Sequence, residues 1–289
     1  MTYTMDSLFV NAYTAMKHHL ASQQGSKLRG LFREEMVKGE KAFFDRVGKF
    51  SVSRITSVGG QNIIHQDAAN TRRMVSIDKF DNSTIIHDIE QVKMLADPTN
   101  DYVREIVGAH NRNFDDVIFA AMLGSASTGK DGAGSQAFDS NYQIAHGSAG
   151  LTLAKLLQAQ RLLQEADVDL DAEKVYLIIN PSALEDLLAI SNFTSSDFQN
   201  NKILGDKQLP MFRGMNVVLS NRIPVHTAGS VYRAIVCSEL ALRVGKYGDP
   251  TVKIDTRVDL VDQPTQIYST SSVGAVRMEE SRIVDVLFQ

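Results

Sequence analysis

Residues 97–124 read DPTNDYVREIVGAHNRNFDDVIFAAMLG, and this stretch predicts one long helix. Asp97 is a favourable N-cap, and Pro98 fits the first helical position, where no N–H is required. Gly124 ends the pattern, because the Gly/Ser-rich segment after it cannot continue a helix. At about 1.5 Å per residue the helix would be roughly 40 Å long, enough to span a domain. Its expected buried stripe consists of Val103, Val107, His110, Phe114, Val117 and Ala121, flanked by Tyr102, Ile106, Ile118 and Met122.

The composition of the chain indicates a soluble, intracellular globular protein. With 289 residues and 43% hydrophobic content it can bury a real core, and its net charge of −4 gives no overall basic character for nucleic-acid binding. One cysteine, Cys237, excludes an intrachain disulfide framework and a Cys-rich zinc site, and we expect it to be a small buried hydrophobe. No signal peptide and no membrane-spanning run is recognisable.

The segments before the long helix are more polar. Residues 6–22 predict an amphipathic helix, residues 28–41 are charged, and the whole beginning is typical of an arm rather than a domain. Residues 50–80 contain two β-rich runs, FSVSRITSV and RRMVSIDKF, joined by a polar segment with Gly59 and Gly60. We interpret them as a long hairpin with a mobile tip.

The second half predicts further helices and strands, which gives an α+β fold class with antiparallel strands. Residues 151–166 predict a helix, and residues 175–179 predict a buried strand that leads into a helix start at Asn180-Pro181, with a capping box at residues 182–185. Residues 252–260 alternate apolar and polar side chains and predict a half-buried strand. Other expected strands are residues 216–219, 231–237 and 281–288.

No catalytic, cofactor or metal site is predicted. Residues 124–130 match the P-loop pattern, but Asp131 stands where Ser or Thr should hold magnesium, and the segment follows a helix instead of leading into one. We therefore interpret it as a flexible Gly/Ser loop. His110 is expected to be a packed imidazole, and Asp115-Asp116 to make solvated or capping contacts.

The order of several segments resembles the major capsid proteins of tailed bacteriophages. These segments are TRRMVSIDKFDN at residues 71–82, the stretch 85–107, FDDVIFAAMLGSASTGKDG at residues 114–132, and the stretches 151–169, 176–188 and 194–224. The resemblance covers nearly the whole chain and implies the HK-ninety-seven-type shell fold. Residues 1–48 would be the N-terminal arm and residues 49–92 the E-loop. The peripheral domain would comprise residues 93–150 and 251–289, with residues 97–124 as the spine helix, and residues 151–250 would form most of the axial domain.

The resemblance implies a structural protein and no enzyme. Copies would assemble as pentamers and hexamers into an icosahedral phage head around double-stranded DNA, contacted without sequence recognition, after assembly in the host bacterial cytoplasm. Expected partners are a separate scaffolding protein, a portal and a decoration protein; no membrane or cofactor is expected. An encapsulin-like compartment holding a cargo enzyme is the alternative with the same fold, and a P-loop nucleotide-using enzyme is a disfavoured one. Contacts between subunits are expected at Arg72 and Arg73, with Arg54 and Lys79 as further candidates.

Overall fold

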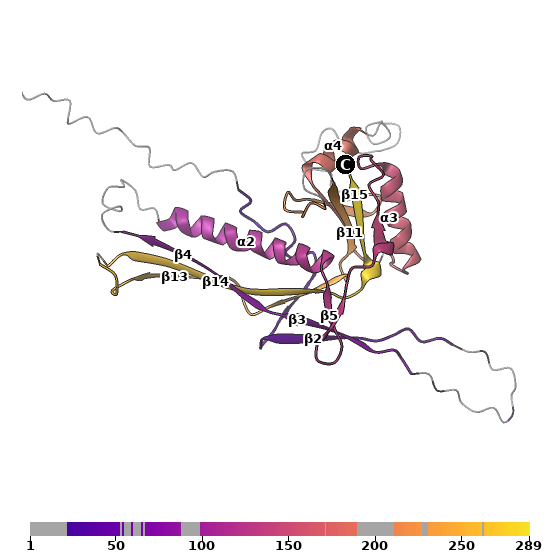
Figure 1. Cartoon of the computed structure of the whole chain (residues 1–289), viewed down its shortest axis with the longest axis horizontal. Helices are drawn as coiled ribbons and strands as arrows, with labels where there is room; N and C mark the ends of the chain where they lie inside the picture. Colours follow the sequence, from indigo (N-terminus) through magenta and orange to yellow (C-terminus); the bar gives the residue numbers. More distant parts are fainter. Residues whose placement is uncertain are drawn as a thin grey trace, which may run out of the picture. The chain divides into compact units, whose positions relative to one another are not determined.

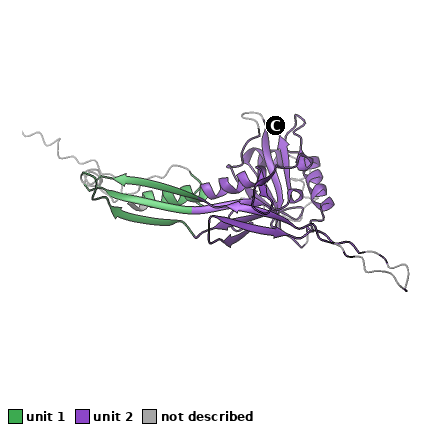
Figure 2. Ribbon diagram, turned by 60° about the horizontal axis from the view of Figure 1, so that its bottom comes forward, with its two compact units in different colours: residues 1–26, 79–112, 249–271 green, residues 27–78, 113–248, 272–289 purple. Residues whose placement is uncertain are grey.

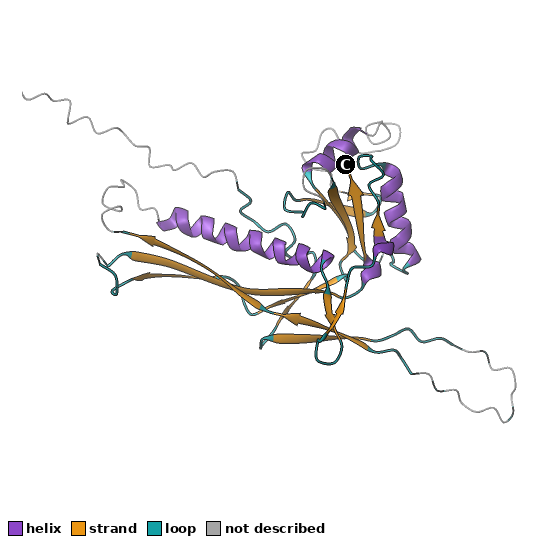
Figure 3. Cartoon of the chain, in the orientation of Figure 1, coloured by secondary structure: helices purple, strands orange, loops and turns teal. Residues whose placement is uncertain are grey.

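A computed structural model describes residues 22–52, 54, 59, 65, 67–87, 99–170, 172–189, 211–226, 231–261 and 263–289. These residues form helices and several β-sheets, which confirms the α+β prediction (Figure 3). The chain divides into two compact units (Figure 2): unit 1 contains residues 1–26, 79–112 and 249–271, and unit 2 contains residues 27–78, 113–248 and 272–289. The helix expected at residues 6–22 lies outside the described residues, apart from Ser22.

The predicted long helix is α2, which runs from Thr99 to Leu123 and has residues in both units (Figure 1). The predicted stripe is right in part: His110 and Phe114 are buried, whereas Val107 and Val117 are only half-buried. Periodicity cannot choose between two adjacent apolar rows on one helix, because the choice depends on the elements packed against it. The row that is buried recurs every four residues and consists of Ile106, His110, Phe114, Ile118 and Met122.

Asp115 and Asp116 make two different contacts within unit 2. Asp115 is fully buried, and its carboxylate accepts hydrogen bonds from the backbone N–H groups of Lys27, at 3.0 Å, and Leu28, at 3.2 Å. Asp116 accepts a hydrogen bond from Nε of Arg222 at 2.7 Å. Asp115 therefore caps the backbone of an early segment of the chain, one of the contacts expected for this pair.

Unit 1 is built on β13 (Thr251–Thr256) and the first residues of β14 (Thr265–Arg277), which pair antiparallel from Thr251↔Thr270 to Thr256↔Thr265. The strand β4 (Asp78–Ile86) also pairs with β14. A small core of Ile86, Ile106 and Ile267 joins these strands to the helix.

The strand predicted at residues 252–260 is shorter and more exposed than expected. It ends at Thr256, and among its apolar side chains only Val252 packs against the core of unit 1. Ile254 is 49% exposed and Val258 is 77% exposed. The alternation is real, but β13 lies at the edge of its sheet, and Ile254 and Val258 stay largely exposed.

His110 is a packed imidazole, as predicted. Its Nε2 lies 2.8 Å from Oγ of Ser269, and its Nδ1 lies 2.8 Å from Oγ of Ser271, all within unit 1. Burial lowers the pKa of His110, and the charge of Asp81 opposes this only in part. The buried ring is therefore held in its neutral form.

We expect His110 to make the protein sensitive to acid. The pKa of His110 is lower in the folded chain than its ordinary value near 6.5, so below about pH 6.5 the unfolded chain binds more protons and stability falls as the pH decreases. His110→Gln should show a weaker loss of unfolding free energy between pH 7.5 and pH 5, measured by chemical denaturation. His87→Gln, at an exposed position, is the matched control and should follow the wild type. Identical pH profiles for all three proteins would contradict the assignment.

Unit 2 contains a six-stranded sheet in the order β7-β15-β11-β8-β10-β9. The central strand β8 pairs in parallel with β10 and antiparallel with β11, which pairs antiparallel with β15. The buried strand predicted at residues 175–179 and the strands predicted near residues 216–219, 231–237 and 281–288 are confirmed. Their bounds are β7 Gln143–Ile144, β8 Val175–Ile179, β9 Met211–Phe212, β10 Met215–Leu219, β11 Tyr232–Ser238 and β15 Ile283–Phe288.

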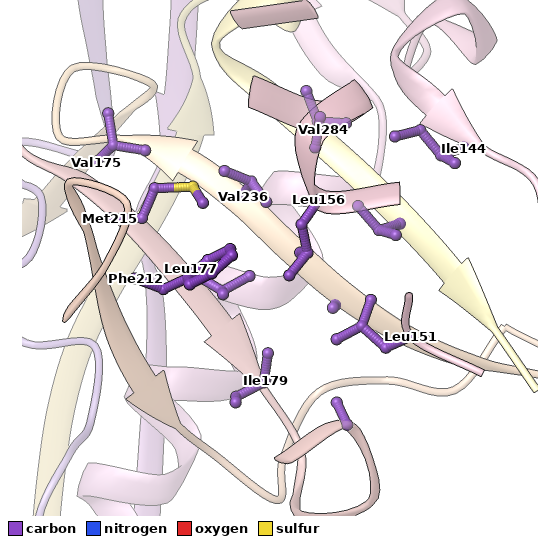
Figure 4. Packing of buried hydrophobic residues seen from close by; sticks show 14 of the residues in the cluster. Ile144, Leu151, Leu156, Val175, Leu177, Ile179, Phe212, Met215, Val236 and Val284 are labelled. Carbon is purple, nitrogen blue, oxygen red and sulfur yellow. The ribbon is translucent and has the colours of Figure 1, made fainter. Parts of the chain in front are cut away.

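Two helices pack against this sheet and complete the main core (Figure 4). In α3 (Leu153–Glu165), Leu156 and Leu163 are fully buried, and in α4 (Pro181–Ala189), Leu187 is fully buried. Both helices were expected from the sequence, but α4 is capped differently. Oδ1 of Asn180 accepts the N–H of Ala183 at 2.8 Å, so Asn180 is the N-cap and the capping box predicted at residues 182–185 is wrong.

Two further groups of strands lie in unit 2. The strand β1 (Arg33–Met36) pairs in parallel with β12 (Leu242–Lys246), and β12 pairs antiparallel with the end of β14. A four-stranded sheet has the order β2-β3-β5-β6. Its strands are β2 Lys41–Arg46, β3 Thr71–Ser76, β5 Ala126–Thr128 and β6 Gly134–Gln136. Among the described residues, short 3-10 helices span Ser140–Tyr142 and Glu280–Arg282.

A pair of glycines lets β3 pass close to β12 and β14. Gly245 and Gly274 are direct partners in the β12–β14 ladder. A Cβ atom on Gly274 would lie 2.0 Å from the carbonyl oxygen of Ser76, and one on Gly245 would lie 3.4 Å from Cγ1 of Val75. Only the absence of a side chain at Gly274 allows this approach.

The hairpin predicted at residues 50–80 has a different first strand. The partner of β3 is β2, with Lys41 opposite Ser76 and Arg46 opposite Thr71. Described residues 47–52 and 54 belong to no strand. Strand pairing depends on contacts between distant segments as well as on β propensity, so propensity alone did not predict the partner of β3. The expected Gly/Ser loop after Gly124 is also wrong in part, since β5 and β6 form a hairpin there. Residues 1–48, the predicted arm, contain β1 and β2, which pair within unit 2.

The main core allows a test with two adjacent leucines of α3. Leu156 is fully buried, whereas Leu157 is 38% exposed. Leu156→Ala should lower the free energy of unfolding of the unassembled subunit by about 2–5 kcal/mol, since it leaves a cavity in the core. Leu157→Ala is the control and should cost less than about 1 kcal/mol. Urea denaturation followed by circular dichroism measures both, and equal losses would show that the buried face of α3 is misassigned.

Candidate inter-subunit site

Arg277, the last residue of β14, is fully buried at the end of α2. Its Nη1 donates to the carbonyl oxygens of Met122, at 2.9 Å, and Gly124, at 2.6 Å, and its Nη2 donates to the carbonyl oxygen of Gln136 at 3.1 Å. The last carbonyl groups of a helix have no partners within the helix. The guanidinium therefore satisfies the end of α2 and joins it to β6.

Glu280 links Arg277 to the four-stranded sheet. One carboxylate oxygen of Glu280 lies 2.7 Å from Nη2 of Arg73 and 3.4 Å from Nε of Arg277. Nε of Arg73 also donates to the carbonyl oxygen of Met278 at 3.4 Å, and Arg46 donates to the same oxygen. Burial lowers the pKa of both Arg73 and Arg277, and Glu280 opposes the shift. An arginine remains charged under these conditions.

The structure places the four predicted contact residues in different surroundings. Arg73 is buried, with 5% exposure, and it pairs with Glu280 inside the subunit. Arg72 is 39% exposed and donates from Nε to Asp45 at 2.5 Å and from Nη2 at 3.1 Å, while its guanidinium lies over the ring of Phe43. The hydrogen bonds from Arg72 hold the pKa of Asp45 below its usual value. Arg54 is exposed outside any strand, and Lys79 is exposed on β4.

A cleft of about 1040 Å³ lies where the chain leaves β2 and returns into β3. At its edge the two chain segments are in contact, because a Cβ atom on Gly48 would lie 2.8 Å from the carbonyl oxygen of Ala69. Arg72 and Arg73 both line this cleft, so the structure brings these two predicted residues together, whereas Arg54 and Lys79 do not line it. The lining residues are Asp45, Arg46, Val47, Asn70, Thr71, Arg72, Arg73, Thr128, Gly129, Lys130, Gln136 and Glu280.

The cleft contains the lysine of the P-loop pattern, but its geometry is not that of a nucleotide site. Thr128 ends β5, Gly129 has a positive φ of 90°, and the chain after Lys130 turns into β6. No helix N-terminus faces Lys130 in this hairpin, so the helix dipole that a P-loop requires is missing. Within the described residues, no group of three or more His, Cys, Asp or Glu side chains could hold a metal ion. The part of the chain that the structure describes also contains no helix long and apolar enough to cross a membrane.

Sequence reasoning missed Arg277 and Glu280, and it considered Lys130 only as the lysine of a rejected P-loop pattern. Arg277 is the last residue of β14, and the local sequence gives no signal that its side chain turns inward. Its partners Met122 and Gln136 lie 155 and 141 residues away along the chain. Only the unusual position of an arginine after the apolar run SVGAV could have drawn attention to it.

Replacing Arg277 should destabilise unit 2. Arg277→Met keeps much of the side-chain volume but leaves the carbonyl oxygens of Met122 and Gly124 without their buried donor. We expect a loss of about 3–5 kcal/mol in unfolding free energy, as for the breaking of a buried ion network. Arg257→Met is the control, because Arg257 pairs with Asp259 at the surface, and it should show no comparable loss. Urea denaturation compares the two, and an Arg277→Met protein as stable as the control would refute the capping role.

Comparisons with known proteins agree with this architecture. A family model described as phage capsid protein matches residues 5–289, and no curated protein matches the chain. The capsid structure of cyanophage P-SCSP1u is 15% identical, with a TM-score of 0.77, over 100% of this chain and 95% of that chain. A structure from Mycobacterium phage Che8 is 16% identical, with a TM-score of 0.75, over 98% of both chains. The capsid of cyanophage Pam1 is 13% identical, with a TM-score of 0.74, over 99% of this chain and 98% of that chain. At such low identity the similarity is one of fold, and it confirms the predicted shell fold.

Proposed function

The chain belongs to the phage capsid protein family, and we propose that its copies assemble as pentamers and hexamers into an icosahedral head around double-stranded DNA. It is a structural major capsid protein of the virion and not an enzyme. The observation that carries this function is the family match over nearly the whole chain, which also favours a phage shell over an encapsulin-like compartment. The P-loop alternative fails on the geometry of the β5–β6 hairpin.

The proposed domain layout follows the predicted one, with α2 as the spine helix. The six-stranded sheet with α3 and α4 would be the axial domain, although it takes β7 and β15 from outside residues 151–250. The segment between β2 and β3 would be the E-loop within residues 49–92, and residues 1–48 would include the arm. A scaffolding protein, a portal, a decoration protein and assembly in the host cytoplasm belong to the same proposal.

Apolar side chains just before and at the start of the proposed E-loop support a contact with a neighbouring subunit. Val47 is 73% exposed, Phe50 is 65% exposed and Val52 is 100% exposed. Three large apolar side chains so close along the chain are costly to leave in water, and a second subunit can cover them. Arg72, Arg54 and Lys79 are the exposed cations proposed to pair with that subunit, and Arg73 would reach it only through the cleft.

Shortening the E-loop should abolish shells and preserve the subunit. The close approach of Gly48 to Ala69 allows residues 50–68 to be replaced by a short Gly/Ser link. Circular dichroism of the variant should stay native, while sedimentation and negative-stain microscopy should show free subunits or capsomers. Each contact is weak, but a closed shell repeats it many times, so its loss is amplified.

In a second variant the same segment is replaced by a Gly/Ser chain of equal length. This variant tests whether assembly requires only the length of the loop or also its side chains. We expect it to fail as well, because it lacks Phe50, Val52 and Arg54. Normal particles from the short variant would show that the E-loop assignment is wrong. Unfolding of the short variant would show that the segment belongs to the core of its own subunit. Absence of closed particles from the wild type itself, expressed with its scaffolding protein, would contradict the proposed assembly.

A further inference from the structure

The cleft at the base of the E-loop has an excess of positive charge. Four cationic side chains, Arg46, Arg72, Arg73 and Lys130, line it with two carboxylates, Asp45 and Glu280. Glu280 is shared between Arg73 and the buried Arg277, so it does not fully neutralise the positive charge of either arginine. Asp131 adds one carboxylate near Arg72. Within the described residues, the ammonium group of Lys130 has no hydrogen bond or ion pair, and its side chain is exposed.

One donor in the wall of this cleft is without a partner. Nη1 of Arg73 is inaccessible to solvent and makes no hydrogen bond, although Nε and Nη2 of the same guanidinium are both bonded. Buried polar atoms in proteins are nearly always bonded, and an unpaired donor on a charged group is costly. The arginine cannot turn toward water, because its other two nitrogens hold it on Met278 and Glu280. Because Nη1 is also closed to solvent, an acceptor oxygen in the cleft can bond it only if the side chains around it move apart.

We propose that the cleft binds an aspartate or glutamate side chain of a second copy of this chain, with Lys130 and Arg73 as its cationic walls. The proposal rests on the proposed function, since it takes the E-loop base to be a contact between shell subunits. A carboxylate offers two planar acceptor oxygens, the geometry that suits guanidinium groups. The chain itself supplies such groups, with 34 acidic residues against 30 basic ones.

The charge pattern disfavours the DNA backbone as occupant. A DNA backbone presents a continuous row of phosphates and favours an extended surface of lysine and arginine. Here the cations are interrupted by Asp45, Glu280 and Asp131, so the cleft fits one or two carboxylates between arginines better than a row of phosphates. A volume of about 1040 Å³ also leaves room for the protein segment that carries the carboxylate.

Lys130 allows the proposal to be tested without disturbing the fold. Lys130→Glu reverses the charge at the cleft, and Lys130→Arg keeps it. Both variants should fold as the wild type does, but nuclease-treated Lys130→Glu protein should give at least about tenfold fewer closed particles, as expected for the loss of a desolvated charge pair repeated through the shell. Lys130→Arg should assemble like the wild type.

Zero-length carbodiimide cross-linking identifies the partner group directly, because it joins an amine only to a carboxylate in contact with it. Particles assembled from equal amounts of ¹⁴N- and ¹⁵N-labelled subunits should yield a mixed-isotope peptide pair joining Lys130 to an Asp or Glu residue. Lys130→Arg particles should lack this pair.

The outcomes separate this inference from the proposed function. If Lys130→Glu protein gives closed shells in the same yield as the wild type, the carboxylate site is wrong and the shell function stands. The same holds if wild-type particles yield no mixed-isotope pair at Lys130. Normal assembly of Lys130→Glu without nucleic acid, together with weaker retention of DNA in the particles, would overturn it in favour of a phosphate site. Failure of the wild type to form shells would count against the proposed function itself.

Discussion

The carbonyl groups at the end of α2 have to find donors inside the protein, and one buried guanidinium supplies them. Arg277 donates to the carbonyl oxygens of Met122 and Gly124 at the helix end and of Gln136 on β6, and Glu280 offsets part of its charge. A buried charge is tolerable only when it is paired and fully hydrogen-bonded, so these groups form one interdependent arrangement. The positions of β14, the end of α2 and the β5–β6 hairpin within unit 2 depend on it.

The same arrangement extends to the surface that we assign to subunit contact. Glu280 contacts both Arg277 and Arg73, and Arg73 belongs to β3, the strand that follows the proposed E-loop. The base of the loop is therefore held by buried ion pairs, whereas the apolar side chains at the start of the loop are exposed. A stiff base limits the conformational freedom that the loop loses when it meets a neighbour, which favours association.

The sequence predicted the elements whose signals are local and missed those that depend on distant partners. The α2 and α3 helices and the strand β8 have long periodic or continuous apolar patterns, and they were found with nearly correct ends. The buried row of α2, the pairing of β3 with β2 and the exposure of Ile254 on β13 depend on what packs against each element. At the candidate site, Arg72 and Arg73 were predicted as a pair, but the burial of Arg73 and the roles of Arg277 and Lys130 arise from residues that the fold brings together.

The glycine pair under β3 limits how this part of unit 2 can rearrange. Gly245 and Gly274 face each other in one ladder, and the carbonyl group of Ser76 lies against Gly274. A slide of β14 by two residues, the smallest that keeps each side chain on its own face, would bring Ser272 or Val276 to that place. Neither side chain fits where a single Cβ atom is already excluded. Shear between β3 and β14 is therefore blocked, and these strands can change position during shell formation only as one rigid piece.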